Sequence, residues 1–411
     1  MKKNKVTSKR LYIKTFGCQM NSRDSEALLG LFLERGYTQA QGYEDADIIL
    51  LNTCSVRAHA EHRVRSILGS FKKLFAKRKA QSAKSKDTQN AMHYAPCAMP
   101  IIGLIGCMAR SQGQEIFKRM PYVNLIVGPA SLHKIPEYIE KIAKRIAHSE
   151  KQGENLRIMD LEDKERKEEF YDAGFRAKSD HAQVVISTGC SNYCSYCVVP
   201  YVRGELRLRK PKDIIAEVKR NVALGINKIT LLGQNVNDYK YIPSSHVLRP
   251  TSFVNLLEMV NEIEGVKEID FLTPHPKNTS NALFRLMAKS NKIKKYLHLP
   301  LQSGSDRILK LMNRGYTKKD YLALVADYKT IVGGTIGTDI IVGFPTETEE
   351  DFHHTKDVLE KVNFMGAYIF KYSPRPNTQA LKLKDDVPQK VKEKRHKILL
   401  DLQKKISSRV K

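Results

Sequence analysis

Between residues 180 and 375, short apolar runs alternate with helical patterns about six times, and this alternation limits the fold more than any other feature of the 411-residue chain. Strands that alternate with helices form parallel sheets, because each helix carries the chain back to the start of the next strand. The expected strands are 183–187, 228–232, 268–272, 296–301, 338–342 and 367–372. The pattern predicts an α/β fold with a parallel βα barrel or half-barrel over 181–376.

Polar or glycine-containing residues follow each run, at the strand ends where βα barrels carry their chemistry. Gln234 and Asn235 follow the second run, Ser303 follows the fourth, and Asp339 lies in the fifth. Turns require the same residue types, so any one of these positions is equally well explained as a turn. The repeated placement of such residues at strand ends favours a functional site at one rim of the barrel. His275 and His298 each lie beside a strand end, where an isolated histidine is more often structural than catalytic, so neither is assigned to metal binding.

Three cysteines follow the first run. They are Cys190, Cys194 and Cys197, and they fall within eight residues directly after the turn 187–189. Thiolates at this spacing on one loop can converge on one metal centre and leave a coordination position open. A structural zinc site is normally closed by a fourth Cys or His at similarly short spacing, and the nearest downstream histidine, His246, is far away in sequence. The spacing favours an iron–sulfur cluster over zinc or unligated thiols.

A second set of cysteines lies at strand ends in the first 147 residues. Cys18, Cys54 and Cys107 each follow an apolar run and a small-residue turn, and helical patterns at 22–35 and 56–75 separate the first runs. Parallel strands joined in this way bring their carboxyl ends to one edge, where open α/β sheets bind ligands. One such cysteine alone would more often be a small buried hydrophobe. Because three cysteines occupy the same position at the end of a strand, we predict that they form one shared site.

A fourth run at 123–129 completes a four-stranded sheet before a helix at 135–147. Cys97 does not fit the pattern; it follows a polar, basic stretch at 77–90 that is typical of a flexible insertion, and is expected to be a loop thiol. The predicted organisation is an N-terminal domain at 1–147, a charged connector at 148–180, the barrel at 181–376 and a C-terminal helical segment at 377–411.

The charge of the chain indicates a polyanionic partner. There are 70 Lys and Arg against 44 Asp and Glu, which gives a formal net charge of +26. Basic clusters at 2–10, 72–86 and 390–411 fit either solvated helix faces and a frayed terminus, or phosphate contacts. Nucleic acid is the favoured partner.

No run reaches the length of about eighteen apolar residues that a membrane span needs, and the basic N-terminus lacks the apolar segment of a secretion signal. Seven cysteines in a long chain without an export signal favour metal or redox chemistry over a disulfide framework. A soluble, cytoplasmic protein without a membrane partner is expected.

The spacing Cys190-x3-Cys194-x2-Cys197, with Tyr196 before the last cysteine, resembles the cluster motif of the radical S-adenosylmethionine (SAM) superfamily. The resemblance extends to the radical SAM methylthiotransferases from about residue 11 to the end of the chain, and six cysteines match in order and context. The other matching segments are TFGCQMN (15–21), NTCSVR (52–57), GCMA (106–109), PYVRG (200–204), LPLQSG (299–304), GTDIIVGFPTET (337–348) and YSPR (372–375).

Two segments, VVPY (198–201) and LLGQNVNDY (231–239), are similar to the branch that modifies N6-isopentenyladenosine beside the tRNA anticodon. The resemblance implies a flavodoxin-like N-terminal domain and a radical SAM half-barrel. The family usually continues into a small β-barrel RNA-binding domain, and the chain ends at Lys411, before that domain is expected. The sequence departs from the family pattern at Leu208, Pro274 and Arg110.

The resemblance also implies the cofactors, which are SAM and two [4Fe-4S] clusters. Cys190, Cys194 and Cys197 would hold the cluster that cleaves SAM, and Cys18, Cys54 and Cys107 would hold an auxiliary cluster that carries sulfur. The candidates for SAM contacts, chosen by their strand-end position, are Gln234, Asn235, Ser303 and Asp339.

The implied partners are the tRNA anticodon loop and an electron donor such as flavodoxin or ferredoxin, while the sulfur donor stays open. Adenosine 37 would be the modified base. Three other readings remain: a methylthiotransferase for threonylcarbamoyladenosine in tRNA, one for an aspartate of a ribosomal protein, and a non-enzymatic metal-dependent RNA-binding protein. The RNA-binding interpretation is disfavoured because each of the two three-cysteine sites leaves a coordination position open. A purely structural metal site is normally closed by a fourth protein ligand.

Overall fold

A computed structural model describes most of the chain, and it divides into two compact units, residues 1–177 and 178–411. The described residues are 9–56, 58–84, 100–148, 156–163, 168–172, 176, 180–243 and 250–408. Cys97 and part of the basic stretch predicted as an insertion lie outside these residues.

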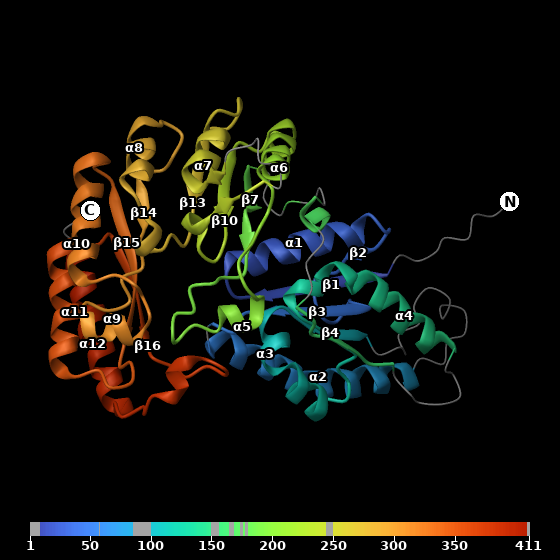
Figure 1. Cartoon of the computed structure of the whole chain (residues 1–411). Coiled ribbons are helices and arrows are strands. Elements are labelled where there is room, and N and C mark those ends of the chain that lie inside the picture. The colour runs from blue at the N-terminus through green and yellow to red at the C-terminus, as the bar shows by residue number, and fades with distance from the viewer. Residues whose placement is uncertain are drawn as a thin grey trace. The chain divides into compact units, whose positions relative to one another are not determined.

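The first unit contains a six-stranded parallel sheet with the order β2-β1-β3-β4-β5-β6 (Figure 1). The strands are β1 (Arg10–Phe16), β2 (Thr38–Gln39), β3 (Ile48–Thr53), β4 (Ile101–Ile105), β5 (Leu125–Val127) and β6 (Ile158–Asp160). This is the order of flavodoxin-like sheets, as expected. The four predicted strands are confirmed, and β2 and β6 extend the sheet at its two edges.

Helices cover both faces of this sheet, and Figure 1 shows α1 on one face and α2 and α3 on the other. The helices are α1 (Gln19–Leu33), α2 (Ala58–Lys84), α3 (Cys107–Arg119) and α4 (Ile135–His148), with 3-10 turns η1 (Pro129–Lys134) and η2 (Glu168–Tyr171). Every residue of β3 and β4 is buried. Strands buried on both sides have continuous apolar sequences rather than alternating ones, which explains the apolar runs of β3 and β4.

The second unit contains the six predicted strands in two three-stranded parallel sheets, β13-β10-β7 and β14-β15-β16. The strands are β7 (His181–Val185), β10 (Lys228–Leu232), β13 (Glu268–Phe271), β14 (Tyr296–His298), β15 (Thr335–Val342) and β16 (Gly366–Lys371). Backbone hydrogen bonds between Ile269 and residues 292 and 294 link the two sheets. The six strands therefore follow one another in an open half-barrel, as Figure 1 shows.

Helices and short strands fill the connections of the half-barrel. The helices are α5 (Val199–Arg203), α6 (Pro211–Ala223), α7 (Phe253–Asn261), α8 (Asn281–Lys289), α9 (Asp306–Leu311), α10 (Lys318–Ile331), α11 (Glu349–Val362) and α12 (Gln389–Ser407). The short elements are β8 (Ser187–Thr188), β9 (Arg207–Leu208), β11 (Lys240–Tyr241), β12 (Thr251–Ser252), η3 (Val236–Asp238), η4 (Pro276–Asn278) and η5 (Gln379–Lys382). Within the described residues, no helix combines the length and apolarity that crossing a membrane requires.

The two faces of the barrel strands differ in polarity. Val184, Leu231 and Phe271 belong to the buried core that packs against the helices. On the opposite face of the first sheet, His181 Nε2 lies 2.8 Å from Thr230 Oγ1. Since side chains alternate along a strand, this face of the first sheet carries His181, Gln183 and Thr230, together with the apolar Val185 and Leu232.

A buried ion pair ties α12 to the loop after β15. Arg395 Nη1 donates to Glu347 Oε1 at 2.7 Å, and the two side chains are 6% and 2% exposed. Glu347 Oε1 also accepts from Gly343 N at 2.9 Å. Arg395 Nη2 also donates to Glu349 Oε2 at 3.0 Å, so Arg395 would keep a counter-ion without Glu347. Removing Arg395 instead would leave the buried Glu347 carboxylate without one, at a cost of about 3–5 kcal/mol.

We therefore expect Arg395→Ala to lower the free energy of unfolding by about 3–5 kcal/mol, measured by urea titration with circular dichroism. The matched control is Lys356→Ala, which breaks the exposed pair of Lys356 with Glu360 in α11. That change should cost less than about 1 kcal/mol, because water screens exposed pairs. Equal effects of the two substitutions would contradict this account of α12 docking.

Candidate functional site

The N-terminal triad, Cys18, Cys54 and Cys107, lies at the carboxyl edge of the first sheet. Cys18 caps α1, Cys54 directly follows β3, and Cys107 is the first residue of α3. The thiols of Cys18 and Cys54 hydrogen-bond to each other, and Cys107 is near enough to act electrostatically on Cys54. The structure thus brings together three cysteines that are far apart in sequence, while their role as cluster ligands stays a prediction.

Two glycines allow this close approach. Gly17 has φ +149°, and a Cβ at Gly17 would lie 2.5 Å from the Cβ of Cys54. Gly106 has φ +86°, and a Cβ there would collide with the side chain of Asn52. The small residues before Cys18 and Cys107 are therefore required by packing as well as by backbone conformation.

A buried pair of asparagines supports the N-terminal triad. Asn21 Nδ2 donates to Asn52 Oδ1 at 2.9 Å, and Asn52 Nδ2 donates to the Asn21 carbonyl and to Ser25 Oγ, also at 2.9 Å. The Cys18 thiol in turn donates to Asn21 Oδ1 at 3.1 Å. Neither asparagine was predicted as a site residue from the sequence, although each stands two or three residues from a cysteine at a strand end.

The electrostatics of the N-terminal triad suit a cationic metal centre. The hydrogen bond with Cys18, burial and the nearby Cys107 all raise the pKa of Cys54. Opposing this, Val56 N donates to Cys54 Sγ at 3.2 Å, and the positive N-terminal ends of α1 and α3 meet Cys18 and Cys107. Three crowded thiolates would be unstable alone and would be stabilised by iron, so the donor set fits a [4Fe-4S] cluster.

The second site is the cysteine loop, residues 190–197, which follows β8. Backbone hydrogen bonds hold it on several sides: Cys190 N donates to the Gly204 carbonyl at 3.1 Å, and Ser195 N donates to the Met312 carbonyl at 3.0 Å. Asn313 Nδ2 also donates to two carbonyls of the loop, at 3.2 and 3.1 Å. A loop fixed in this way presents its thiols in one arrangement before any ligand binds.

The thiols of the cysteine loop are near enough to act electrostatically on one another. Burial raises the pKa of Cys197 to about 12, with a further contribution from Cys194. Burial also raises the pKa of Cys190, and Cys194 adds to it. As in the N-terminal triad, deprotonated thiols here call for a positive centre, and the donor set fits a cluster.

Within the part of the chain that the structure describes, no three His, Cys, Asp or Glu side chains form a group suited to a single metal ion. A [4Fe-4S] cluster bonds each cysteine to a different iron atom, so its ligands need not converge on one point. The two triads are consistent with the cluster chemistry in this respect.

Unpartnered polar atoms at the barrel rim indicate a polar ligand. Ser187 Oγ, Asn235 Oδ1 and His275 Nε2 are buried at the ends of three neighbouring strands and have no hydrogen-bond partner among the described residues. A buried polar atom without a partner costs about 1–3 kcal/mol, which a bound ligand such as SAM would relieve.

His275 is held neutral and in one tautomer. Burial lowers its pKa to about 2, and the nearby Arg314 and Lys277 contribute. Its Nδ1 accepts from Lys277 N at 3.2 Å, so the ring proton is assigned to Nε2. His275, to which the sequence assigns no role, therefore presents its Nε2–H as an unused hydrogen-bond donor at the barrel rim.

The four candidate SAM contacts have different surroundings. Gln234 is half-buried, and Asn235 Nδ2 donates to Asn278 Oδ1 at 3.3 Å. Ser303 is fully buried and its Oγ accepts from Ser305 N at 3.2 Å. Asp339 Oδ2 lies 3.1 Å from His298 Nε2. Their contact with SAM stays a prediction.

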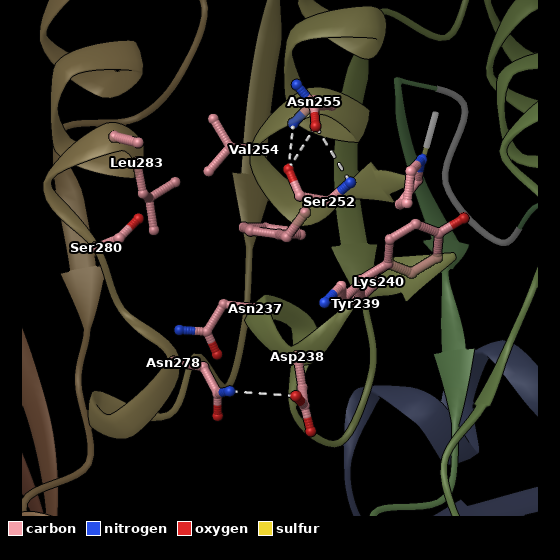
Figure 2. Close-up of a pocket in the computed structure, with 13 residues that line it drawn as sticks. Asn237, Asp238, Tyr239, Lys240, Ser252, Val254, Asn255, Asn278, Ser280 and Leu283 are labelled. Atoms are coloured by element: carbon pink, nitrogen blue, oxygen red, sulfur yellow. Dashed lines mark hydrogen bonds between the residues drawn. The ribbon is translucent and has the colours of Figure 1, made fainter. Parts of the chain in front are cut away.

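Figure 2 shows a separate pocket of about 530 Å³ between the loop after β10, α7 and α8. Asn278 Nδ2 donates to Asp238 Oδ1 across it at 3.1 Å, and Ser252 with Asn255 forms a capping box at the start of α7. The pocket is lined neither by the six cysteines of the two triads nor by the four candidate SAM contacts. It is distinct from the site predicted from sequence.

Comparisons with known proteins agree with the two-part architecture. Residues 184–359 match the radical SAM superfamily, and residues 10–128 match the uncharacterized protein family UPF0004. A solved structure of the cobalamin-dependent S-adenosylmethionine radical enzyme OxsB is similar in fold, with a TM-score of 0.54, 11% sequence identity, and coverage of 98% of this chain and 56% of that chain.

Two relatives match nearly the whole chain, and both are described as tRNA-2-methylthio-N6-dimethylallyladenosine synthase. The protein from Caldicellulosiruptor saccharolyticus is 42% identical over 97% of this chain and 79% of its own length. The protein from Hydrogenobaculum sp. is 41% identical over 98% of this chain and 85% of its own length. These matches show an enzyme that uses SAM and [4Fe-4S] cofactors. On this evidence the chain belongs to the radical SAM methylthiotransferase family.

Proposed function

We propose that the protein attaches a methylthio group to C2 of N6-isopentenyladenosine at position 37, next to the tRNA anticodon. The observation that carries this proposal is the near-complete match to relatives described as synthases of this modified nucleoside. The net charge of +26 supports an RNA substrate, because Lys and Arg bind phosphates. The proposed location is the cytoplasm, and the proposed electron donor is a flavodoxin or ferredoxin.

The two triads have separate tasks in this proposal. Cys190, Cys194 and Cys197 hold one cluster, and Cys18, Cys54 and Cys107 hold a second. When bound, these groups and two molecules of SAM supply the radical, the methyl group and the sulfur. Because each triad comes from a single unit, each can assemble without the other.

The rest of the chain orients SAM and the base. Among the candidate contacts, Asn235 has the best support, because its buried Oδ1 lacks a partner among the described residues. We infer that the neutral His275 donates from Nε2 to the ligand at the same rim, and that Gln234, Ser303 and Asp339 contribute to its pocket. The modified base must leave the loop stack to react, as bases of RNA loops readily do.

Iron content tests the two-cluster proposal directly. The full chain should bind about eight iron atoms after anaerobic reconstitution, since two [4Fe-4S] clusters contain that number. Iron and sulfide assays with absorption spectroscopy measure this. About four iron atoms per fully folded chain, or stoichiometric zinc without cluster absorption, would contradict it.

The substrate is tested by mass spectrometry of tRNA nucleosides after anaerobic incubation with SAM, reductant and tRNA that carries N6-isopentenyladenosine. The 2-methylthio product should form, and tRNA without the isopentenyl group should stay unmodified. A product on threonylcarbamoyladenosine, or a thiomethyl group on a ribosomal protein, would replace the proposed substrate with one of the alternatives.

A further inference from the structure

Two exposed aromatic side chains lie on β16, the last strand of the half-barrel. Tyr368 is 63% exposed and Phe370 is 40% exposed, whereas Ile369 between them is buried in the core that packs against the helices. Because side chains alternate along a strand, Tyr368 and Phe370 share the inner face of β16, which is turned away from the helices. Large apolar side chains that are exposed together often mark a binding surface. We call this pair the aromatic wall.

A polar network on β14 and β15 supports the aromatic wall. His298 Nε2 donates to Asp339 Oδ2 at 3.1 Å, because an ionised carboxylate can only accept. In the neutral ring, His298 Nδ1 then accepts from the Tyr296 hydroxyl at 3.4 Å. The centroids of the His298 and Tyr368 rings are 6.0 Å apart. Since the His298 ring is held at both nitrogens, it gives Tyr368 a fixed neighbour.

The backbone makes room for this network at Gly337. A Cβ at this position would collide with the Tyr296 hydroxyl. Gly337 is also the register partner of His298, so a larger residue there would push Tyr296 away from the histidine. The support of the aromatic wall therefore depends on a close approach that only glycine allows.

Packing connects the aromatic wall to the cysteine loop. Ile341 of β15 is the register partner of Phe370, and partners in a parallel pair point to the same face. Ile341 packs against an apolar cluster that includes Phe344 and Tyr372, and Tyr196 of the cysteine loop packs against the same cluster. A ligand on the aromatic wall would therefore lie beside the loop that is proposed to hold the SAM-cleaving cluster.

The charge beside the aromatic wall limits which ligand it can take. Asp339 is the register partner of Tyr368, its side chain is 26% exposed, and its ion-pair partner is His298 rather than a lysine or arginine. Asp270 on β13 is paired with Lys294 at 3.3 Å. An uncharged apolar group fits beside Tyr368, whereas a carboxylate would be repelled by Asp339. An isopentenyl group is apolar, and a threonylcarbamoyl group carries a carboxylate.

We propose that Tyr368 and Phe370 are specificity-determining residues that bind the isopentenyladenine base of the substrate RNA. This inference rests on the proposed function and adds the residues that select the base. The aromatic rings stack on the flipped adenine, and the isopentenyl group is removed from water against the same surface. Asp339 disfavours bases that carry an acidic group at N6.

The test compares the binding of two RNA hairpins with the sequence of an anticodon stem-loop, one with N6-isopentenyladenosine and one with adenosine at the same position. Both are titrated by fluorescence anisotropy against the reconstituted full chain, with SAM and without reductant, so that no turnover occurs. The parent should bind the isopentenyl hairpin more tightly than the adenosine hairpin.

The variant that combines Tyr368→Ala and Phe370→Ala should bind the isopentenyl hairpin about 5–150-fold more weakly, which is the usual effect of removing an aromatic partner of a base. Its affinity for the adenosine hairpin should change much less, because contacts to the phosphates are kept. The preference for the isopentenyl group should therefore shrink. Tyr368→Phe, which keeps the ring, should retain the preference of the parent.

The matched control is Leu224→Ala, which removes an apolar side chain that is 65% exposed at the end of α6. It should bind both hairpins as the parent does. Circular dichroism and iron content show whether each variant is folded and loaded. If the double variant does not fold, the single variant Tyr368→Ala, at the more exposed of the two positions, gives the same test.

Equilibrium dialysis with SAM separates binding of the base from binding of the cofactor. The double variant should bind SAM as tightly as the parent. Weaker SAM binding with an unchanged preference between the hairpins would overturn the proposal, because the aromatic wall would then hold the adenine of SAM.

An unchanged preference with unchanged SAM binding would overturn the proposal as well. So would tighter binding of a third hairpin, with threonylcarbamoyladenosine, than of the isopentenyl hairpin by the parent. The product assay on the parent distinguishes these failures from failure of the proposed function. If the parent makes the 2-methylthio product while the variants keep its preference, only this inference is wrong; if the parent makes no product, the proposed function is wrong and this inference with it.

Discussion

Replacement of Cys190, Cys194 and Cys197 together by alanine should abolish both 5′-deoxyadenosine formation and tRNA methylthiolation. The physical reason is that these residues are the proposed ligands of the cluster that reduces SAM, and no second cysteine group lies in the same unit within the described residues. Iron should fall to about half of the parent value, since the other cluster remains. Anaerobic assays of both products, with iron analysis, measure the effect.

Isosteric Cys→Ser replacements provide a control for packing, because Cys194 is buried and alanine leaves a small void. The serine triple variant should be as inactive as the alanine variant. Formation of 5′-deoxyadenosine above background by either folded variant would show that the reducing cluster is bound elsewhere.

Replacement of Cys18, Cys54 and Cys107 by alanine should have a different effect: SAM cleavage continues and the methylthio product disappears. All three residues belong to the first unit, whereas the cysteine loop and barrel belong to the second, so we expect radical formation to proceed without the N-terminal triad. Parallel measurements of 5′-deoxyadenosine and of 2-methylthio nucleoside, from the same reactions, reveal the separation.

Cys97→Ala is the matched control for this variant, since it removes the seventh cysteine without touching either triad. It should retain both activities. If the N-terminal triple variant is folded and still makes methylthiolated adenosine, the triad only braces the sheet, and the assigned role is wrong. Loss of product in the Cys97 variant would also contradict the division of roles.

The proximity of Cys18, Cys54 and Cys107 could be predicted, because it depends only on the shared direction of the parallel strands. Parallel strands bring all their carboxyl ends to one edge, whatever the details of packing. The asparagine pair at Asn21 and Asn52 could not be predicted in the same way, because its hydrogen bonds depend on how α1 rotates against β3. The short strands β2 and β6 were missed because runs of two or three residues carry no periodic signal.

The barrel shows a similar limit. All six strands follow from alternation, but strand-end position does not reveal which side chain is already used within the protein. Ser303 is fully buried with its hydroxyl bonded to backbone, whereas Asn235 retains an unpartnered atom among the described residues. Arg314 was also missed, because its contact with Cys194 joins residues 120 positions apart.

The two triads differ in how far along the chain their members are separated, and this determines how fast each can form when the complete chain refolds. Cys190, Cys194 and Cys197 lie on one loop, so closing that loop costs little chain entropy. Cys18, Cys54 and Cys107 meet only after two crossover connections have formed, and contacts between distant residues form slowly. Iron offered to an unfolded full-length chain would therefore find the local loop first, and occupancy of the N-terminal triad would report that the first sheet has folded.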